Sequence, residues 1–340
     1  MKRILRRLLP DALWGRLRAA KSWINEKAGS RVAGVILKRS ITGLSAPTLQ
    51  RTLAEAGYSV ARAGDYYSPL PSVDALRKNR ARWDKPSTLQ GIHFDAEAMK
   101  SLFLHLLKGY LQEFSAYPPY EHLQKIGFGP GYTAVDALTL HMMIRHLKPG
   151  RYIEVGSGLS TYYASLAAEK NAAEGCPVEI TCIEPNPYES LYSINNISII
   201  KSEVQSIDLS LYQTLQQNDI LFIDSSHMLR VDSDVPYLFL EVLPRLAPGV
   251  VIHVHDVPFP YNTPYPADLW IFGQEWPMFW NEAMMLQAFL SYNSAFHIML
   301  STPLLRHMDE AFLRVHVPNY QSVEQNANAF SSIWLRRGSA

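Results

Sequence analysis

Two short segments of this 340-residue chain carry side chains that could remove a proton and hold a cation. Asp224 and His227 stand three residues apart directly after one apolar run, and Asp256 follows another. A histidine, whose ordinary pKa is about 6.5, is a natural base for a hydroxyl group, and carboxylates hold divalent cations that make a hydroxyl more acidic. We therefore expect a catalytic cluster of Asp224, His227 and Asp256. Loop-ordering hydrogen bonds and a surface histidine are the alternative interpretation of the same residues.

The cation of this cluster, Mg²⁺ or another divalent ion, would have Asp224 and Asp256 as its ligands, with His255 as a third candidate. A histidine at that third position disfavours an all-oxygen magnesium site. A softer divalent cation, or none, is the alternative.

A second segment has the pattern of a nucleoside-binding turn. Gly156 and Gly158, on either side of Ser157, permit a tight turn and close approach of a ligand to the backbone. Glu154 before the turn would repel a phosphate, and Glu184, at the end of the next apolar run, is placed to accept both hydroxyls of a ribose. This combination favours a nucleoside that carries an amino acid and a sulfonium, which describes S-adenosylmethionine. A Rossmann-like enzyme that uses another nucleotide is the alternative.

The elements that must position these residues alternate between strands and helices. Seven strands are predicted, at residues 151–155, 179–183, 197–201, 219–223, 250–255, 296–300 and 331–335. Helical patterns lie between the first five, at 161–169, 188–194, 209–216 and 234–246. This order predicts an α/β fold with a Rossmann-like, doubly wound sheet, mostly parallel, with an antiparallel edge strand because no clear helix separates the last two strands. Ligands in such sheets bind at the carboxyl ends of the strands, which would bring both segments to one rim.

Four segments of the chain together resemble a known family. EVGSG at 154–158, IEPNP at 183–187, DILFIDSSH at 219–227 and LAPGVVIHVHDV at 246–257 are similar to class I S-adenosylmethionine-dependent methyltransferases, and to the bacterial branch with EVGSG, FIDSSH and HDV signatures. The pair Asp224 and His227 resembles the D-x-x-H of metal-dependent sugar and small-molecule O-methyltransferases, in which the aspartate binds the cation and the histidine is the base. Ser160 departs from the pattern, since many relatives have a third glycine there. The resemblance implies a cofactor site formed by Glu154, Gly156, Ser157, Gly158, Glu184, Glu203 and Asp224. In it Glu154, Gly156 and Gly158 would hold the methionine part, Glu184 the ribose and Glu203 the adenine side.

Three regions are expected along the chain: a basic amphipathic segment at 1–45, a helical cap at 46–130 and the S-adenosylmethionine-binding domain at 131–340. Residues 1–40 contain eleven Lys and Arg residues and two acidic residues, whereas the net charge of the whole chain is +1. The segment could contact an anionic membrane through residues 1–40, or pack on the body with its charges solvated. This near-zero net charge gives no reason to expect nucleic acid as a partner. Two cysteines and no long apolar run indicate a cytoplasmic protein, with association at the inner membrane surface as the alternative.

The predicted function is O-methylation of a hydroxyl on a sugar, a glycan or another small molecule, as in polysaccharide or natural-product modification. Residues 258–280 are rich in aromatic side chains and prolines, which suits a rigid acceptor pocket, or a hydrophobic lid on the core. The alternatives are an RNA or protein methyltransferase that uses the basic segment, and a cofactor-binding scaffold without turnover.

Overall fold

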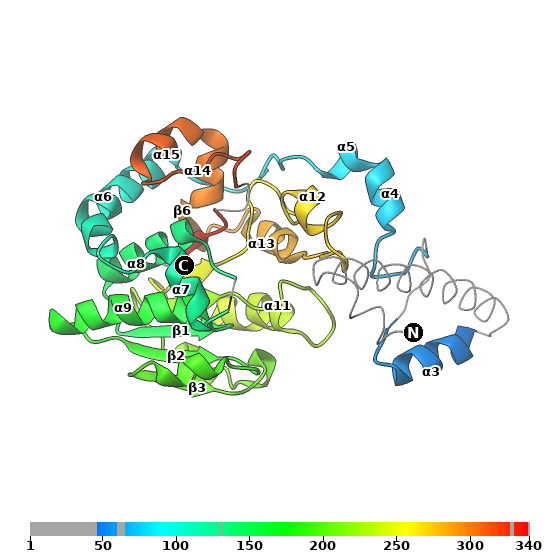
Figure 1. The fold of residues 1–340 in the computed structure, drawn as a ribbon, viewed down its shortest axis with the longest axis horizontal. Helices are drawn as coiled ribbons and strands as arrows, with labels where there is room; N and C mark the ends of the chain where they lie inside the picture. Colours follow the sequence, from blue (N-terminus) through cyan, green and yellow to red (C-terminus); the bar gives the residue numbers. More distant parts are fainter. Residues whose placement is uncertain (1–45, 60–64, 130, 327–329, 339–340) are drawn as a thin grey trace, which may run out of the picture. The chain divides into compact units, whose positions relative to one another are not determined.

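The computed structural model describes residues 46–59, 65–129, 131–326 and 330–338 (Figure 1). The chain divides into two compact units, Met1–Ser72 and Val73–Ala340. The described part of the first unit contains one helix, α3 (Ala46–Glu55). The predicted basic segment at 1–45 lies outside the described residues, and the predicted region boundaries remain predictions. Within the described ranges, no helix combines the length and apolar character needed to cross a membrane.

The second unit is built on a seven-stranded sheet with the order β3-β2-β1-β4-β5-β7-β6. The first five strands pair in parallel, and β7 lies antiparallel between β5 and β6. This arrangement confirms the predicted Rossmann-like, mostly parallel sheet with an antiparallel edge. The strands are β1 (Arg151–Val155), β2 (Glu179–Ile183), β3 (Ile197–Ile200), β4 (Ile220–Ile223), β5 (Val251–Val254), β6 (Phe296–Ser301) and β7 (Ile333–Arg337).

The central strands are covered on both faces. Every residue of β4 and β5 is buried, which is why both read as nearly continuous apolar runs rather than as alternating ones. His253 is the polar exception within β5, and it stacks on Trp334 of β7 with 3.9 Å between ring centroids. The core therefore lies on both sides of β4 and β5, and the polar residues that follow these strands emerge at its edge.

Helix α8 packs against both α6 and α9, and α8 and α9 run side by side in Figure 1. The π-helix η4 packs against α13. The helices of the second unit are α4 (Val73–Lys78), α5 (Arg80–Trp83), α6 (Ala96–Phe114), α7 (Tyr120–Leu123), η1 (Gln124–Ile126), α8 (Ala134–Leu147), α9 (Leu159–Ala173), η2 (Glu189–Ser193), η3 (Val204–Ser206), α10 (Ser210–Gln213), α11 (Asp234–Pro236), η4 (Tyr237–Val242), η5 (Leu243–Arg245), α12 (Ala267–Trp270), α13 (Glu282–Leu290), α14 (Thr302–Met308) and α15 (Glu310–His316).

Helix α8 is buried on almost every side and positions one wall of the site. Thr133 caps its first turn by accepting a hydrogen bond from the backbone N–H of Asp136. Near its other end, Arg145 is 3% exposed and joins Glu113 of α6 to Glu174 after α9. Because it is fixed at both ends, α8 can hold a polar side chain at a defined position against the sheet.

Three of the predicted helices are shorter or more irregular than expected. Residues 188–194 form the 3₁₀ helix η2, and 209–216 contain only the short α10. Residues 234–246 are divided into α11, η4 and η5. Pro236 and Pro244 lack the N–H that a regular helix needs, which accounts for the interruption in the last case.

Candidate active site

The glycine turn after β1 passes directly against the end of β4. Gly156 has a φ of +81°, and a Cβ there would lie 1.8 Å from the carbonyl oxygen of Asp224. A Cβ on Gly158 would lie 2.7 Å from the carbonyl oxygen of Phe128. Both positions therefore require glycine, and the close approach at Gly156 places the turn beside Asp224.

Glu154 is completely buried below this turn. Its carboxylate accepts hydrogen bonds from the hydroxyls of Ser160 and Thr161, the latter at 2.7 Å, and burial raises its pKa to about 8. Ser160 thus anchors the start of α9 to Glu154. The predicted contact of Glu154 with the methionine part of a cofactor remains a prediction.

Glu184 lies where a ribose would be expected, at the end of β2 beside the glycine turn. Its carboxylate is half-buried and accepts hydrogen bonds from the N–H groups of Ser157 at 3.3 Å and Asn186 at 2.7 Å. Glu203, the third acid of the expected cofactor site, is exposed after β3 and contacts Gln205 at 3.3 Å. The turn offers glycines without a side chain and an accessible carboxylate, a set that fits a nucleoside with ribose hydroxyls.

The three predicted catalytic residues meet at the carboxyl ends of β4 and β5. His227 Nε2 lies 3.4 Å from Asp224 Oδ1 and 3.6 Å from Asp256 Oδ2. His227 and Asp256 have φ values of 58° and 56°, a left-handed conformation that is uncommon for residues other than glycine. Backbone conformations of this kind concentrate at functional sites, where the surrounding structure enforces them.

His227 also contacts an acid that the sequence analysis missed. Its Nδ1 lies 2.7 Å from Glu282 Oε2, at the start of α13, and Glu282 is 2% exposed. Burial alone would lower the pKa of His227, but the hydrogen bonds to Asp224 and Glu282 raise it well above its ordinary value. An acid in the first turn of a helix is too common to have marked Glu282 in the sequence.

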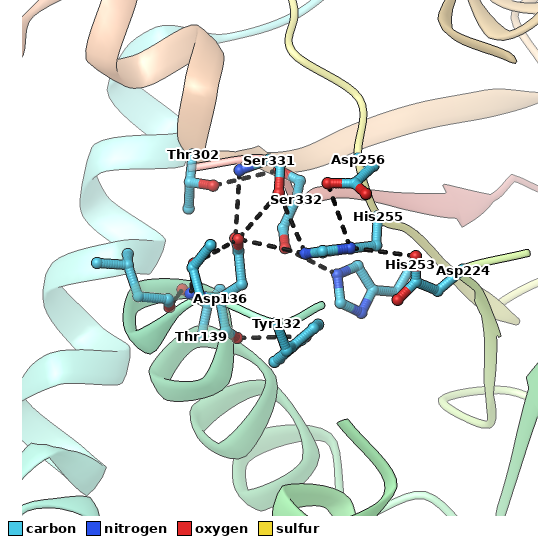
Figure 2. A network of polar contacts seen from close by, with 12 residues as sticks. Tyr132, Asp136, Thr139, Asp224, His253, His255, Asp256, Thr302, Ser331 and Ser332 are labelled. Atoms are coloured by element: carbon cyan, nitrogen blue, oxygen red, sulfur yellow. Dashed lines mark hydrogen bonds and ion pairs between the residues drawn. The ribbon is translucent and has the colours of Figure 1, made fainter. Parts of the chain in front are cut away.

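Figure 2 shows a second buried histidine, His255, between two carboxylates. Its Nδ1 lies 3.2 Å from Asp224 Oδ1, and its Nε2 lies 3.3 Å from Asp136 Oδ2 on α8. Ser331 donates to Asp136 at 3.0 Å and lies 3.1 Å from His255 Nε2. Burial would lower the pKa of His255, but Asp224 and Asp256 raise it well above its ordinary value. Asp136 and Ser331 were not expected from the sequence, because they are 195 residues apart and ordinary in their local context.

The cluster has donors that suit a cation. One ligand atom each from Asp224, His227 and Asp256 lies within 4.8 Å of the others. Separations of 3.4 and 3.6 Å are close to those between ligands held at about 2.0–2.2 Å from a tetrahedral ion. Two carboxylates and one imidazole fit zinc or a first-row transition metal better than magnesium, which prefers oxygen ligands. His255, the weaker candidate in the sequence, lies beside this group with both ring nitrogens in contact with other side chains.

A pocket opens next to the cluster and has Asp256 in its wall. Its empty volume is about 670 Å³, and prolines and aromatic rings dominate the lining. Tyr261 and Tyr265 stack in it with 3.9 Å between ring centroids. The lining residues are Asp256, Pro258, Phe259, Pro260, Tyr261, Pro264, Tyr265, Trp270, Trp280, Pro303, Arg306, His307, Val323, Phe330 and Ser331.

The outer wall of the pocket is held by α5. Both terminal nitrogens of Arg80 lie 2.7 Å from the carboxylate oxygens of Asp268 on α12. The Trp83 ring packs near Phe272 with 6.1 Å between centroids, and Ser87 donates its N–H to the Pro260 carbonyl at 2.8 Å. Residues 80–87 thus fasten the segment that carries the aromatic lining.

Comparison with known proteins agrees with this architecture. Residues 153–257 match the family model described as a methyltransferase domain (Methyltransf_24). An uncharacterized protein from Archaeoglobus fulgidus is 30% identical over 168 residues, which cover 46% of this chain and 74% of that protein.

Solved structures with a similar fold include two O-methyltransferases. TomG from Streptomyces achromogenes, solved with SAM, is 14% identical, with 73% of this chain and 100% of that chain covered and a TM-score of 0.43. The enzyme from Bacillus cereus, solved with SAH, is 13% identical, with 72% and 100% covered and a TM-score of 0.39. The domain match confirms the predicted enzyme class, an S-adenosylmethionine-dependent methyltransferase. The chain carries a methyltransferase domain on a Rossmann-like sheet, and it belongs to the same family as the Archaeoglobus fulgidus protein.

Proposed function

We propose that this methyltransferase transfers the methyl group of S-adenosylmethionine to a hydroxyl of a sugar, a glycan or another small molecule. One observation carries the proposal: Asp224 touches the glycine turn through its backbone and Asp256 lines the aromatic pocket, while His227 faces both carboxylates. A donor at the turn and an acceptor in the pocket would therefore meet at this cluster.

The chemistry requires orientation and removal of one proton. S-adenosylmethionine supplies an electrophilic methyl group whose sulfur leaves as a neutral thioether. As the acceptor oxygen forms its bond to the methyl carbon, His227 Nε2 takes the hydroxyl proton. The aromatic walls of the pocket hold the acceptor, and Glu184 binds the ribose hydroxyls of the cofactor.

A divalent cation fits between Asp224 and Asp256 and would act as a Lewis acid that makes the hydroxyl more acidic. The carboxylates around His227 raise its pKa and so favour the protonated ring, whereas positive charge that enters the site favours the neutral ring that can act as the base. The sulfonium and the cation both bring such charge. Ligation of the cation by His227 Nε2 would compete with its role as the base, and activity in EDTA separates the two roles.

Calorimetry tests the cofactor site. We expect S-adenosylmethionine and S-adenosylhomocysteine to bind in the micromolar range, and Glu184→Ala to weaken both by about 1–3 kcal/mol because buried polar partners are left unpaired. Glu203→Ala removes an exposed acid after β3 and should reveal whether the adenine side depends on it. Tight binding of NAD without binding of S-adenosylmethionine would refute the cofactor assignment.

Turnover of hydroxylated acceptors, followed by release of S-adenosylhomocysteine, tests the cluster. His227→Ala should lower kcat by roughly 10²- to 10⁴-fold, the usual range for a general base, with little change in cofactor affinity. His105→Ala, an exposed histidine on α6, is the matched control and should have wild-type activity. If EDTA abolishes activity and a divalent cation restores it, the cation is required. Full activity of His227→Ala would refute the base assignment.

The basic segment at 1–45 is proposed to contact anionic membrane, and this proposal rests on the sequence charge alone. Deletion of residues 1–40 should reduce binding to vesicles that contain anionic lipid, in a salt-dependent way, and leave cofactor affinity unchanged. Equal vesicle binding with and without the segment would refute membrane contact.

A further inference from the structure

Glu282 is a buried acid whose local surroundings give it a single hydrogen-bond partner. It is 2% exposed, and its Oε2 lies 2.7 Å from His227 Nδ1. Its other oxygen, Oε1, is buried and has no hydrogen-bond partner among the residues that the structure describes. A carboxylate in such a place costs free energy of folding, because half of its hydrogen-bonding capacity is lost on burial. The contact with His227 is therefore the interaction that explains a carboxylate at this position.

The backbone around Glu282 also fastens His227. The N–H groups of Asn281 and Glu282 both donate to the His227 carbonyl, at 3.0 and 3.2 Å. The Asn281 side chain accepts from the N–H of Leu229 at 2.6 Å. These bonds fix the backbone that directly follows the His227 Cα and so stabilise the left-handed conformation of His227, whose φ is 58°.

The ring of His227 also has an aromatic neighbour. Trp280 packs against it with 4.7 Å between ring centroids, and Trp280 lines the acceptor pocket. Three consecutive residues, Trp280, Asn281 and Glu282, thus contact the ring face, the backbone and Nδ1 of one histidine. The pocket wall and the histidine are parts of the same local structure.

From this geometry we infer that Glu282 is the positioning residue of His227, which keeps the proton of the neutral ring on Nδ1 and leaves the Nε2 lone pair for the acceptor hydroxyl. A neutral imidazole has one protonated nitrogen, and the hydrogen bond made by one nitrogen decides which. Both ring nitrogens face carboxylates, which only accept, but the contact of Nδ1 with Glu282 at 2.7 Å is much the shorter, so the proton of a neutral His227 favours Nδ1. Nε2 then points toward Asp224 and Asp256, where its separations are 3.4 and 3.6 Å. The inference rests on the proposed role of His227 as the base.

Glu282→Gln is the decisive variant because it keeps the shape and removes the charge. A carboxamide can donate to Nδ1 as well as accept from it, so the preference for one tautomer is lost. We expect kcat to fall roughly 10- to 100-fold, the usual effect of losing such a supporting partner, with acceptor KM and cofactor affinity within about twofold of wild type. Glu282→Asp retains the charge on a shorter side chain and should recover part of the lost kcat.

Glu97→Gln is the matched control. Glu97 is an exposed acid in the first turn of α6, and its side chain pairs with Lys100 at 3.1 Å. This variant makes the same chemical change outside the cluster and should keep wild-type kcat. A comparable loss of kcat in Glu97→Gln would mean that the effect of Glu282→Gln is not specific to the contact with His227, and it would overturn the inference.

Nitrogen NMR of histidine-labelled, EDTA-treated protein reads the tautomer directly, at a pH where the ring is neutral. Wild-type His227 should show protonated Nδ1 and unprotonated Nε2, and Glu282→Gln should show a mixture. An unchanged tautomer, or an unchanged kcat, would overturn the inference. If Glu282→Gln fails to fold, the same two measurements on Glu282→Asp decide: a protonated Nδ1 with partly reduced kcat supports the inference, and a shifted tautomer with full kcat overturns it.

His227→Ala keeps the two hypotheses separate. If His227→Ala is inactive and Glu282→Gln is fully active, only the positioning role is wrong. If His227→Ala retains full activity, the proposed base is wrong whatever the tautomer measurement shows.

Discussion

Removal of the Asp136 carboxylate should destabilise the protein more than removal of any surface acid. Asp136 is fully buried and accepts hydrogen bonds from Thr133 at 2.7 Å and from the Ser331 hydroxyl at 3.0 Å, and it faces His255 at 3.3 Å. Burial would raise the pKa of Asp136, but the hydrogen bond with His255 lowers it below its ordinary value, so the carboxylate is charged. Asp136→Ala leaves a buried histidine and two hydroxyls without this partner.

The expected loss of free energy of unfolding follows from these contacts of Asp136. Breaking a buried charged pair by removing one partner typically costs about 3–5 kcal/mol, whereas loss of an exposed helix cap costs about 1 kcal/mol. Asp136→Ala should therefore lower the free energy of unfolding by about 3–5 kcal/mol. Asp95→Ala, which removes the exposed cap of α6 and its 2.9 Å bond to the N–H of Ala98, should lower it by about 1 kcal/mol.

Urea unfolding, followed by circular dichroism, measures both variants under one set of conditions. The slope of free energy against urea should stay at the wild-type value, so that the shift in midpoint reports stability. Asp136→Asn keeps the shape of the side chain, and its loss of free energy of unfolding should lie between those of Asp136→Ala and Asp95→Ala. Equal costs for Asp136→Ala and Asp95→Ala would refute the view that the network of Figure 2 holds α8 to the sheet.

Three further perturbations probe other parts of the chain. Burial lowers the pKa of His141 from 6.5 to about 4, so below pH 6.5 the unfolded chain binds a proton that the folded chain does not. The free energy of unfolding should therefore fall by about 3 kcal/mol between pH 6.5 and pH 4. Urea titrations measure this fall, and His141→Gln should reduce it. Gly156→Ala should weaken S-adenosylmethionine binding more than tenfold in calorimetry because its Cβ has no room, whereas Gly109→Ala, with open space around it, should bind normally. Arg80→Ala breaks the pair with Asp268 and should raise acceptor KM a few-fold in steady-state kinetics without changing cofactor affinity; an unchanged KM would show that this pair does not order the pocket wall.

The strands and the meeting of Asp224, His227 and Asp256 could be predicted from the sequence because their signals are local. Each parallel strand is a short apolar run, and β1 and β2 have the predicted bounds. The glycine turn and the D-x-x-H segment each lie within a few residues of a strand end. Since the carboxyl ends of adjacent parallel strands meet at one rim, strand order alone brings Asp224 and Asp256 together.

The helices around the sheet were less predictable. A helical pattern of apolar residues at 209–216 is compatible with two turns, yet only Ser210–Gln213 is helical. Packing and the space between strands decide how much of such a segment becomes helix, and the local sequence pattern predicts neither of them. β7 likewise begins at Ile333 rather than 331, which leaves Ser331 to contact Asp136.

The sequence by itself determined the sheet, the glycine turn after β1 and the residue types that can move a proton, since these depend on periodicity, glycine and short spacing. Only the tertiary structure decided what those residues contact. Glu282 lies 55 positions from His227, and Asp136 lies 119 positions from His255. An acid gains a role from the partner that folding brings within hydrogen-bond distance, and that partner is set by the packing of α8 and α13 against the sheet rather than by any neighbour in the chain.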